Sequence, residues 1–325
     1  MNIDSYADGL LKRLRGGPAS IEAAAEAMHT SPATIEEAAV SLQQRGYRVV
    51  STHARTLRLE SVPDLLLADE IEPALSGPRF GRPLHSYGRL GSTNVVARRL
   101  AEAGAPEGTV VTAEEQTEGR GRQGRSWHSP AGVGVWMSVV LRPRISPPAA
   151  AGLPLVAALA VSAALRDMTE VEIGIKWPND VQAGGKKLAG ILGESVVEGD
   201  HVRYTVLGMG INVNQVATDM PGWLQDSACS LAMITHRRWA RVDVLAAVLG
   251  ALETRYDAYC REGFDPLRGE FTAYSSLLGR QVRLVRRSDE ITGTVLDLTP
   301  EGSLVLATES ATAHIHVGDA TLRYI

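Results

Sequence analysis

LAGILGESVVEGDHVRYTVLGMGINV, residues 188–213, decides the fold class because it reads as two strands joined by a tight turn. The runs Leu188–Val197 and His201–Val213 are rich in apolar and β-branched residues, and Glu198-Gly199-Asp200 between them is a turn sequence. Strands joined by so short a turn must be antiparallel. The sheet that contains them therefore cannot be wholly parallel.

Strands and helices alternate on both sides of this hairpin, which indicates a sheet flanked by helices. The predicted elements are strand Leu84–Tyr87, helix Asn94–Ala103, strand Thr109–Ala113, strand Val133–Leu141, a long helix ending at Arg166, strand Val171–Lys176 and helix Val242–Arg261. We expect an α+β domain with a mixed sheet over residues 84–274, and no doubly wound sheet.

The first 62 residues predict three helices followed by a β-hairpin. The third helix has the clearest signals, because Ser31 can cap it, Pro32 suits its first position and Gly46 can end it. Three helices with a β-ribbon form the winged helix-turn-helix arrangement. Residues 63–83, which hold four prolines and two glycines, predict a linker around one short helix.

Residues 275–325 predict a small β-barrel of the SH3-like kind, because short strands alternate there with polar turns. The predicted strands are Gln281–Arg286, Ile291–Leu298, Ser303–Ala307, Ala313–Val317 and Thr321–Ile325.

The charge balance excludes a broad attraction to nucleic acid, since the net charge is −4. Residues 1–65 hold seven basic and eight acidic side chains, and the exposed positions of the third helix are mostly Glu, Gln, Ser and Thr. DNA readers usually neutralise phosphates with Lys or Arg. Two interpretations of the N-terminal domain stay open: a DNA-binding repressor domain, or a structural remnant.

The two cysteines, Cys229 and Cys260, are too few for a disulfide framework. The N-terminus has no signal-peptide pattern, and the apolar run from Ala149 to Leu165 is interrupted by Gly152 and Pro154. These features predict a cytoplasmic protein without a membrane span.

The segment Gly119–Trp127, which we call the glycine–arginine loop, reads GRGRQGRSW. Arginine pairs with phosphate oxygens through a planar, permanently charged fork, and glycine allows close backbone approach. The spacing also fits G-x-G-x-x-G, but the dinucleotide fingerprint needs a following helix and an acidic residue about 20 positions on. A strand-like run follows instead, so we expect a loop that binds a phosphorylated ligand and is mobile when empty.

Four further segments and Gln116 carry polar groups beside apolar runs. Ser92-Thr93-Asn94 begins a helix, so its hydroxyls either cap the helix or bind a ligand. Gln116 ends a strand, where it either holds a turn or binds a polar ring. The others are Lys176-Trp177-Pro178-Asn179-Asp180, Lys186-Lys187-Leu188-Ala189-Gly190-Ile191-Leu192 and Gly208-Met209-Gly210-Ile211-Asn212. Lys187 is either a surface lysine or an inward amine beside a cavity.

Together, in order and spacing, these motifs resemble the biotin–protein ligase family, and the resemblance covers nearly the whole chain. It is similar in particular to the bifunctional form that has an N-terminal winged helix and also represses the biotin operon. The resemblance implies an ATP-dependent enzyme that makes biotinyl-5′-AMP and transfers biotin to a lysine of a carrier protein.

The resemblance also implies roles for individual residues. Lys187, Arg120 and Arg122 would be catalytic, with Lys187 bridging the biotin carboxylate and the α-phosphate. The biotin-binding residues would be Ser92, Thr93, Asn94, Gln116, Arg120, Gly121, Arg122, Lys187 and Gly190. The nucleotide-binding residues would be Arg125, Trp127, Asn179, Asp180, Gly208, Gly210 and Asn212. Asn179 and Asp180 would contact either the nucleotide or Mg²⁺, and either Asp180 or solvent would activate the carrier lysine.

The implied substrates are biotin and ATP with Mg²⁺, and no metal site made by the protein alone is expected. The implied partners are the biotin carboxyl carrier protein of acetyl-CoA carboxylase or a similar carboxylase, DNA for the repressor role, and a second copy of the chain in a homodimer. The alternatives are a biotin-responsive repressor as the main or additional role, and a lipoate or octanoate ligase on a related scaffold.

Overall fold

The computed structural model describes the chain except for residues 1, 53, 286–289, 317–320 and 325, and of residues 321–324 it describes the backbone alone. The predicted strand ends Arg286, Val317 and Ile325 lie outside the described residues. The chain divides into two compact units, Met1–Asp64 and Leu65–Ile325.

The first unit has the predicted three helices and hairpin. Ser31 Oγ accepts a hydrogen bond from the Thr34 amide at 3.2 Å, Pro32 begins the third helix, and Gly46 after it has a φ of +92°. Both end signals of this helix therefore work as the sequence predicted. The elements are α1 (Ile3–Arg15), β1 (Ala19–Ser20), α2 (Ile21–Ala27), α3 (Pro32–Gln44), β2 (Arg48–Ser51) and β3 (Thr56–Ser61), with sheet order β1-β3-β2.

The second unit is built on a seven-stranded mixed sheet, as the hairpin at residues 188–213 predicted. Strands β4 and β5 are parallel, and the other neighbouring pairs are antiparallel. The order is β4 (Leu84–Leu90), β5 (Val110–Gln116), β6 (Gly134–Leu141), β10 (His201–Asn212), β9 (Lys186–Glu198), β8 (Asp180–Ala183) and β7 (Gly174–Lys176).

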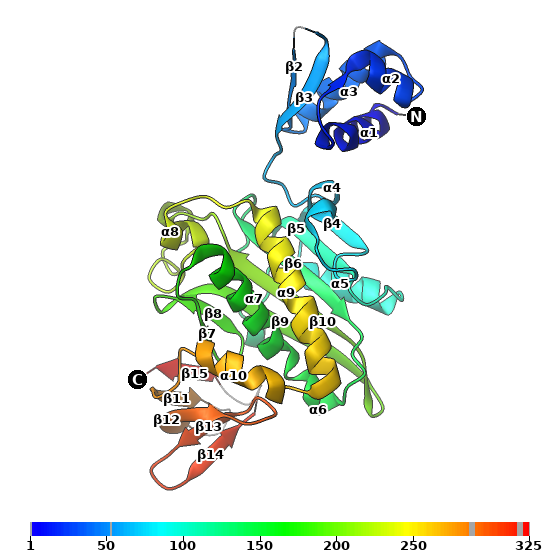
Figure 1. The fold of residues 1–325 in the computed structure, drawn as a ribbon. Coiled ribbons are helices and arrows are strands. Elements are labelled where there is room, and N and C mark those ends of the chain that lie inside the picture. Colours follow the sequence, from blue (N-terminus) through cyan, green and yellow to red (C-terminus); the bar gives the residue numbers. More distant parts are fainter. Residues whose placement is uncertain (1, 53, 286–289, 317–320, 325) are drawn as a thin grey trace. The chain divides into compact units, whose positions relative to one another are not determined.

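Helices cover both faces of this sheet (Figure 1). On one face, α7 (Leu153–Thr169) lies against the strands and α9 (Arg241–Glu262) packs against α7. On the other face, Ala97 and Ala101 of α5 (Thr93–Glu102) pack on Val111 of β5 and Val206 of β10. The remaining helices of this unit are α4 (Ala68–Ile71), η1 (Glu72–Ala74), η2 (Arg122–Gly124), α6 (Pro147–Ala150), η3 (Ala217–Asp219), α8 (Leu231–Thr235) and α10 (Asp265–Tyr274).

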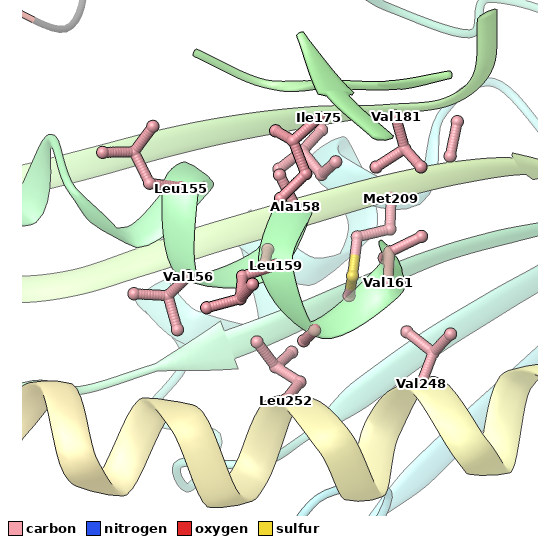
Figure 2. Packing of buried hydrophobic residues seen from close by; sticks show 14 of the residues in the cluster. Leu155, Val156, Ala158, Leu159, Val161, Ile175, Val181, Met209, Val248 and Leu252 are labelled. Carbon is pink, nitrogen blue, oxygen red and sulfur yellow. The ribbon is translucent and has the colours of Figure 1, made fainter. Parts of the chain in front are cut away.

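Helix α7 is buried nearly all round, which explains why its sequence is apolar on every face. Figure 2 shows Leu155, Ala158 and Val161 of this helix between the sheet and α9. The stretch Pro147–Thr169 is long and apolar enough to cross a membrane, but 78% of its most apolar window is buried inside the protein. It forms the core layer between the sheet and α9.

The structure corrects the prediction near residue 176. The predicted strand Val171–Lys176 is reduced to β7, and β8 follows at once and pairs with it in antiparallel register, Lys176 opposite Asp180. The sequence analysis missed β8 because four residues between Asn179 and the pair Gly184-Gly185 show no measurable periodicity. Helices α8 and α10 were missed as well.

The C-terminal strands form one antiparallel sheet that shares the core of the larger domain. Its order is β14 (Thr312–Ile315), β13 (Leu304–Ala307), β12 (Glu290–Leu298), β11 (Gln281–Val285) and β15 (Thr321–Tyr324). Buried Leu298, Leu304 and Leu306 belong to the same hydrophobic cluster as α7 and α9. The C-terminal sheet is therefore packed on the larger domain as part of one unit.

Candidate active site

One cavity of about 150 Å³ gathers most of the residues singled out in the sequence. Its lining includes Ser92, Thr93, Asn94, Gln116, Arg120, Gly121, Arg122, Arg125, Trp127, Asn179, Lys187, Gly190, Gly208 and Gly210. A second cavity of about 520 Å³ shares Arg125, Trp127 and Lys187 with the first and adds Asn212. Asp180 adjoins them through an ion pair with Lys187.

The glycine–arginine loop is folded as a small hairpin over the first cavity. The Gly121 amide donates to the Arg125 carbonyl at 2.7 Å, and the Trp127 amide donates to the Gly119 carbonyl at 2.8 Å. Positive φ values at Gln123 and Gly124 turn the chain at the tip. The guanidinium of Arg122 reaches back into the protein and donates to Asn179 Oδ1 at 3.0 Å.

At the other end of the cavity, Gln116 holds the start of α5. Its Oε1 accepts from the backbone amide of Thr93 at 2.8 Å and from the Thr93 hydroxyl at 3.0 Å, while its Nε2 donates to Ser129 Oγ. Ser92 occupies the N-cap position but makes no side-chain capping bond. Gln116 thus holds the turn and supplies the cap in this structure, and both Gln116 and Ser92 line the cavity.

The side-chain amide of Asn94 has partners on both sides. Its Oδ1 accepts from Ser138 Oγ at 2.6 Å, and its Nδ2 donates to Glu194 at 2.7 Å. A Cβ atom at Gly208 would lie 2.1 Å from Asn94 Oδ1, so this glycine makes room for the amide. Sequence reasoning missed Ser138, although a lone polar residue in the apolar run Val135–Leu141 was a usable signal.

Lys187 lines both cavities and is partly exposed to solvent. Its Nζ lies 2.6 Å from Asp180 Oδ1 and 5.2 Å from the centre of a Trp127 ring. Both side chains of the ion pair keep partial solvent access, at 32% for Lys187 and 26% for Asp180.

Trp127 separates the two cavities and rests on glycines. A Cβ atom at Gly210 would lie 2.4 Å from Trp127 Nε1, and one at Gly190 would lie 2.9 Å from its Cζ3. The indole nitrogen is buried and has no hydrogen-bond partner among the described residues. Gly190 and Gly210 thus leave room for the Trp127 side chain, and the indole N–H of Trp127 is available to donate a hydrogen bond to a ligand.

Positive charge is concentrated around the first cavity. Arg120, Arg122, Arg125 and Lys187 line it, and the described lining contains no Asp or Glu. Burial lowers the pKa of Arg122 and of nearby Lys176, and the charge of Asp180 partly opposes this lowering in both. Charged groups held at a desolvation cost are stabilised when an anion arrives, so the cavity suits an anionic ligand.

The second cavity adds residues that the sequence analysis did not select. They include His128, Trp223 and Leu224. Trp223 is 65% exposed on the segment between η3 and α8. That segment is fixed to the site by main-chain bonds, since the Lys187 amide donates to the Ser227 carbonyl and the Cys229 amide donates to the Lys187 carbonyl.

Comparison with known proteins supports the motif-based resemblance. The model of the biotin/lipoate A/B protein ligase family matches residues 87–212, and the model of the biotin protein ligase C-terminal domain matches residues 277–323. The chain is 38% identical over 281 residues to the "Bifunctional ligase/repressor BirA" of Bacillus subtilis, which covers 86% of each protein.

Two further relatives agree. The "Biotin--[acetyl-CoA-carboxylase] ligase" of Mycobacterium tuberculosis is 34% identical and covers 78% of this chain and 92% of that protein. The structure of the biotin protein ligase of Aquifex aeolicus in complex with biotin and ATP aligns with a TM-score of 0.66 and 34% identity, covering 74% of this chain and 99% of that one. From its motifs, its fold and these matches, the chain belongs to the biotin protein ligases of the biotin/lipoate A/B protein ligase family.

Proposed function

We propose that the protein activates biotin with ATP and transfers it to a lysine of a biotin carboxyl carrier protein. In the first step the biotin carboxylate attacks the α-phosphorus of ATP, which forms biotinyl-5′-AMP and releases pyrophosphate. In the second step the carrier lysine amine attacks the acyl carbon and AMP leaves. The observation that carries this proposal is the set of four cations around one cavity without a carboxylate among its described lining residues.

The charge distribution addresses the main difficulty of the first step, because two anions must come into contact. Opposite unit charges about 4 Å apart attract by about 1 kcal/mol in water and about 4 kcal/mol at an effective dielectric of 20. Arginines on a loop that closes over the ligands would gain from this difference by excluding water. We expect loop closure and adenylation to be coupled for this reason.

We assign the biotin end to the α5 side and the nucleotide end to the β8 side. Ser92, with a hydroxyl that makes no capping bond, and the Thr93–Gln116 pair would bind the head group. Asn94 would act mainly by orienting Ser138, since its amide is already bonded on both sides. Arg120, Gly121 and Arg122 would surround the biotin carboxylate and the α-phosphate.

Lys187 would contact both reacting groups. It is held by Asp180 in this structure, so substrate binding must exchange that carboxylate for the phosphate and biotin oxygens. Lys187 then stabilises the charge that is shared between the acid and the phosphorus as the acyl-phosphate bond forms. Trp127 would cover the adenine, and Arg125, Gly208, Gly210 and Asn212 would complete the nucleotide pocket.

The nucleotide end of the site can supply one or two oxygen ligands to Mg²⁺, but not a full set of protein ligands. Among the described residues, none of the His, Cys, Asp and Glu side chains form a cluster of three that could hold a metal ion. Mg²⁺ in nucleotide sites commonly takes one or two protein oxygens and completes its shell with phosphates and water. Asp180 and Asn179 would supply such oxygens, and the ion would neutralise phosphate charge.

A pyrophosphate-release assay tests this function and its closest alternative. The protein is incubated with ATP and Mg²⁺ and with either biotin or lipoate. We expect release that depends on biotin, with no stimulation by lipoate or octanoate. Release driven by lipoate alone would replace the proposal with a lipoate ligase.

We propose that the N-terminal unit is a winged helix-turn-helix and that DNA-dependent repression is a second, weaker role. The support is the succession α1–α2–α3 with the β2–β3 hairpin, and a relative that is named a ligase/repressor. Two of its arginines form ion pairs within the unit, since Arg45 pairs with Asp8 and Arg55 pairs with Glu36.

We therefore expect weak binding of the N-terminal unit to DNA, which moderate salt abolishes. A gel shift on the gene's own upstream DNA, with and without biotin and ATP, measures it, and tight salt-resistant binding would contradict this assignment.

For the rest of the chain we propose a ligase domain over residues 84–274 and an SH3-like C-terminal barrel over residues 275–325. We also propose a homodimer that pairs through the edge of the central sheet. Strand β9 supports this, because β8 pairs with it only as far as Gly190, while β9 continues to Glu198. Sedimentation velocity with and without biotin and ATP would detect the dimer.

A further inference from the structure

Strand β7, at the edge of the seven-stranded sheet, is held from outside by the C-terminal part of the chain. It is three residues long, and β8 is its only neighbour among the strands that the structure describes. On its other side, the Ile175 carbonyl accepts from the Ser276 amide at 2.9 Å and from the Ser276 hydroxyl at 3.1 Å. The segment that leads into β11 therefore completes this edge.

A second hydrogen bond links Trp177, the residue directly after β7, to the C-terminal sheet itself. Trp177 is 1% exposed, and its indole Nε1 donates to the Gly302 carbonyl at 3.1 Å. Gly302 lies in the turn between β12 and β13, where its own amide donates to the Thr299 carbonyl at 2.9 Å and the Thr299 amide donates to the Ser303 carbonyl at 2.8 Å. The acceptor of the indole bond is thus part of a tightly bonded turn.

This turn is also seated in the core. Gly302 has a φ of +83°, and a Cβ atom there would lie 2.6 Å from Leu155 Cδ1 of α7. Only glycine fits this combination of backbone conformation and close contact. The carbonyl that receives the Trp177 bond therefore has a fixed position relative to the central sheet.

Trp177 itself borders the first cavity, and the residues assigned to the nucleotide follow it in the chain. Two residues beyond Trp177, Asn179 accepts from Arg122 at 3.0 Å and donates to the Ile191 carbonyl at 2.7 Å. Asp180 follows and pairs with Lys187. A displacement of Trp177 would be passed to both residues, because a single proline, Pro178, separates Trp177 from Asn179.

We propose that Trp177 is a positioning residue through which the C-terminal sheet fixes the nucleotide end of the active site. This inference rests on the proposed function, in which Asn179 and Asp180 face ATP. The C-terminal sheet then contributes to ATP binding without touching ATP, by holding Trp177 and Ile175. The bonds made by Ser276 and Gly302 reach β7 and Trp177, and neither bond reaches the biotin end, which is built from α5, β5 and β6.

Two variants test the link from its two ends. Trp177→Phe removes the indole N–H and keeps an aromatic ring in the core. Gly302→Ala leaves the indole intact and displaces the turn that accepts its bond. Each has a matched control. Trp136→Phe removes an indole bond of the same length, 3.1 Å to the Pro130 carbonyl, and Gly279→Ala adds a Cβ at a φ of +71° with nothing within 4 Å.

The readouts are the KM for ATP in biotin-dependent pyrophosphate release, the Kd for biotin measured by calorimetry without ATP, and Tm. We expect Trp177→Phe to raise the KM for ATP about tenfold, because about this factor corresponds to the loss of one buried hydrogen bond. The biotin Kd should change by less than about twofold. Gly302→Ala should raise the KM for ATP in the same selective way. Both controls should lower Tm and keep the KM for ATP within about twofold of wild type.

The outcomes separate this inference from the proposed function. If wild-type protein releases no pyrophosphate with biotin, the proposed function fails. If wild type is active and Trp177→Phe leaves the KM for ATP unchanged, or weakens biotin as much as ATP, the positioning role is refuted. If Trp177→Phe does not fold, shown by loss of biotin binding and of the thermal transition, the ATP-selective effect in Gly302→Ala decides the question.

Discussion

Removing the charge of Lys187 should slow adenylation about a hundredfold at saturating biotin and ATP. We choose Lys187→Met because methionine keeps an apolar stem beside the Trp127 ring and lacks only the ammonium group. The amine now lies 2.6 Å from Asp180, so it must give up that ion pair to reach the substrates. Its contribution to the transition state is the difference between the two arrangements.

The magnitude follows from the geometry and the exposure. An ammonium about 4 Å from an anion gains about 4 kcal/mol at an effective dielectric of 20. Because the Lys187 side chain is 32% exposed and loses its bond to Asp180, we discount this gain to about 3 kcal/mol. That corresponds to a factor of roughly 10² in rate, which is the range seen when one preorganised donor is removed from an active site.

The assay is single-turnover formation of biotinyl-5′-AMP at saturating biotin and ATP. Lys186→Met is the matched control, because Lys186 is adjacent, carries the same charge and binds the Gln225 carbonyl at 3.0 Å outside the first cavity. It should stay within about threefold of wild type. Full activity in Lys187→Met, or equal losses in the two variants, would refute the reasoning.

Three other predictions concern packing and burial. Gly208→Ala should weaken biotin binding, because the new Cβ would lie 2.1 Å from Asn94 Oδ1; calorimetry measures this, and an unchanged biotin Kd would contradict it. Arg241→Met should cost about 3 to 5 kcal/mol in urea unfolding, since Arg241 is fully buried and leaves Glu114 without its charge partner; a cost below about 1 kcal/mol would exclude a structural ion pair. Burial raises the pKa of the Cys229 thiol from 9.0 to about 11, so iodoacetamide at pH 8 should not modify it until the protein unfolds. The stability that this neutral thiol contributes is complete below pH 9 and is lost as the pH rises toward about 11, and modification of the native protein at pH 8 would contradict the burial.

Much of the fold could be predicted because local signals and packing agree. The cap at Ser31, the stop at Gly46 and the turn at Glu198-Gly199-Asp200 each act through neighbouring residues, so the sequence displays them directly. Strand β8 could not be predicted, because it exists through pairing with β7 and β9 and is too short to show a period. Tertiary contacts of this kind have no local signature.

In the candidate site, too, the residues could be predicted from the sequence, but the contacts between distant segments could not. The motifs grouped Arg122, Lys187 and Gly208 in one site through the family resemblance that they carry, and all three line the first cavity. The connections between motifs could not be predicted, since the bond from Arg122 to Asn179 and the bonds from Asn94 to Ser138 and Glu194 join segments that are distant in sequence. Whether an amide binds a ligand or orients a neighbour depends on these long-range partners.

The most direct measurement is the intact mass of a biotin carboxyl carrier domain after incubation with the protein, biotin, ATP and Mg²⁺. The cationic cavity and Lys187 predict a carrier that gains one biotin on one lysine, with AMP and pyrophosphate as the other products. A carrier of unchanged mass, in a reaction where the protein is folded and binds biotin, would contradict the proposed reaction.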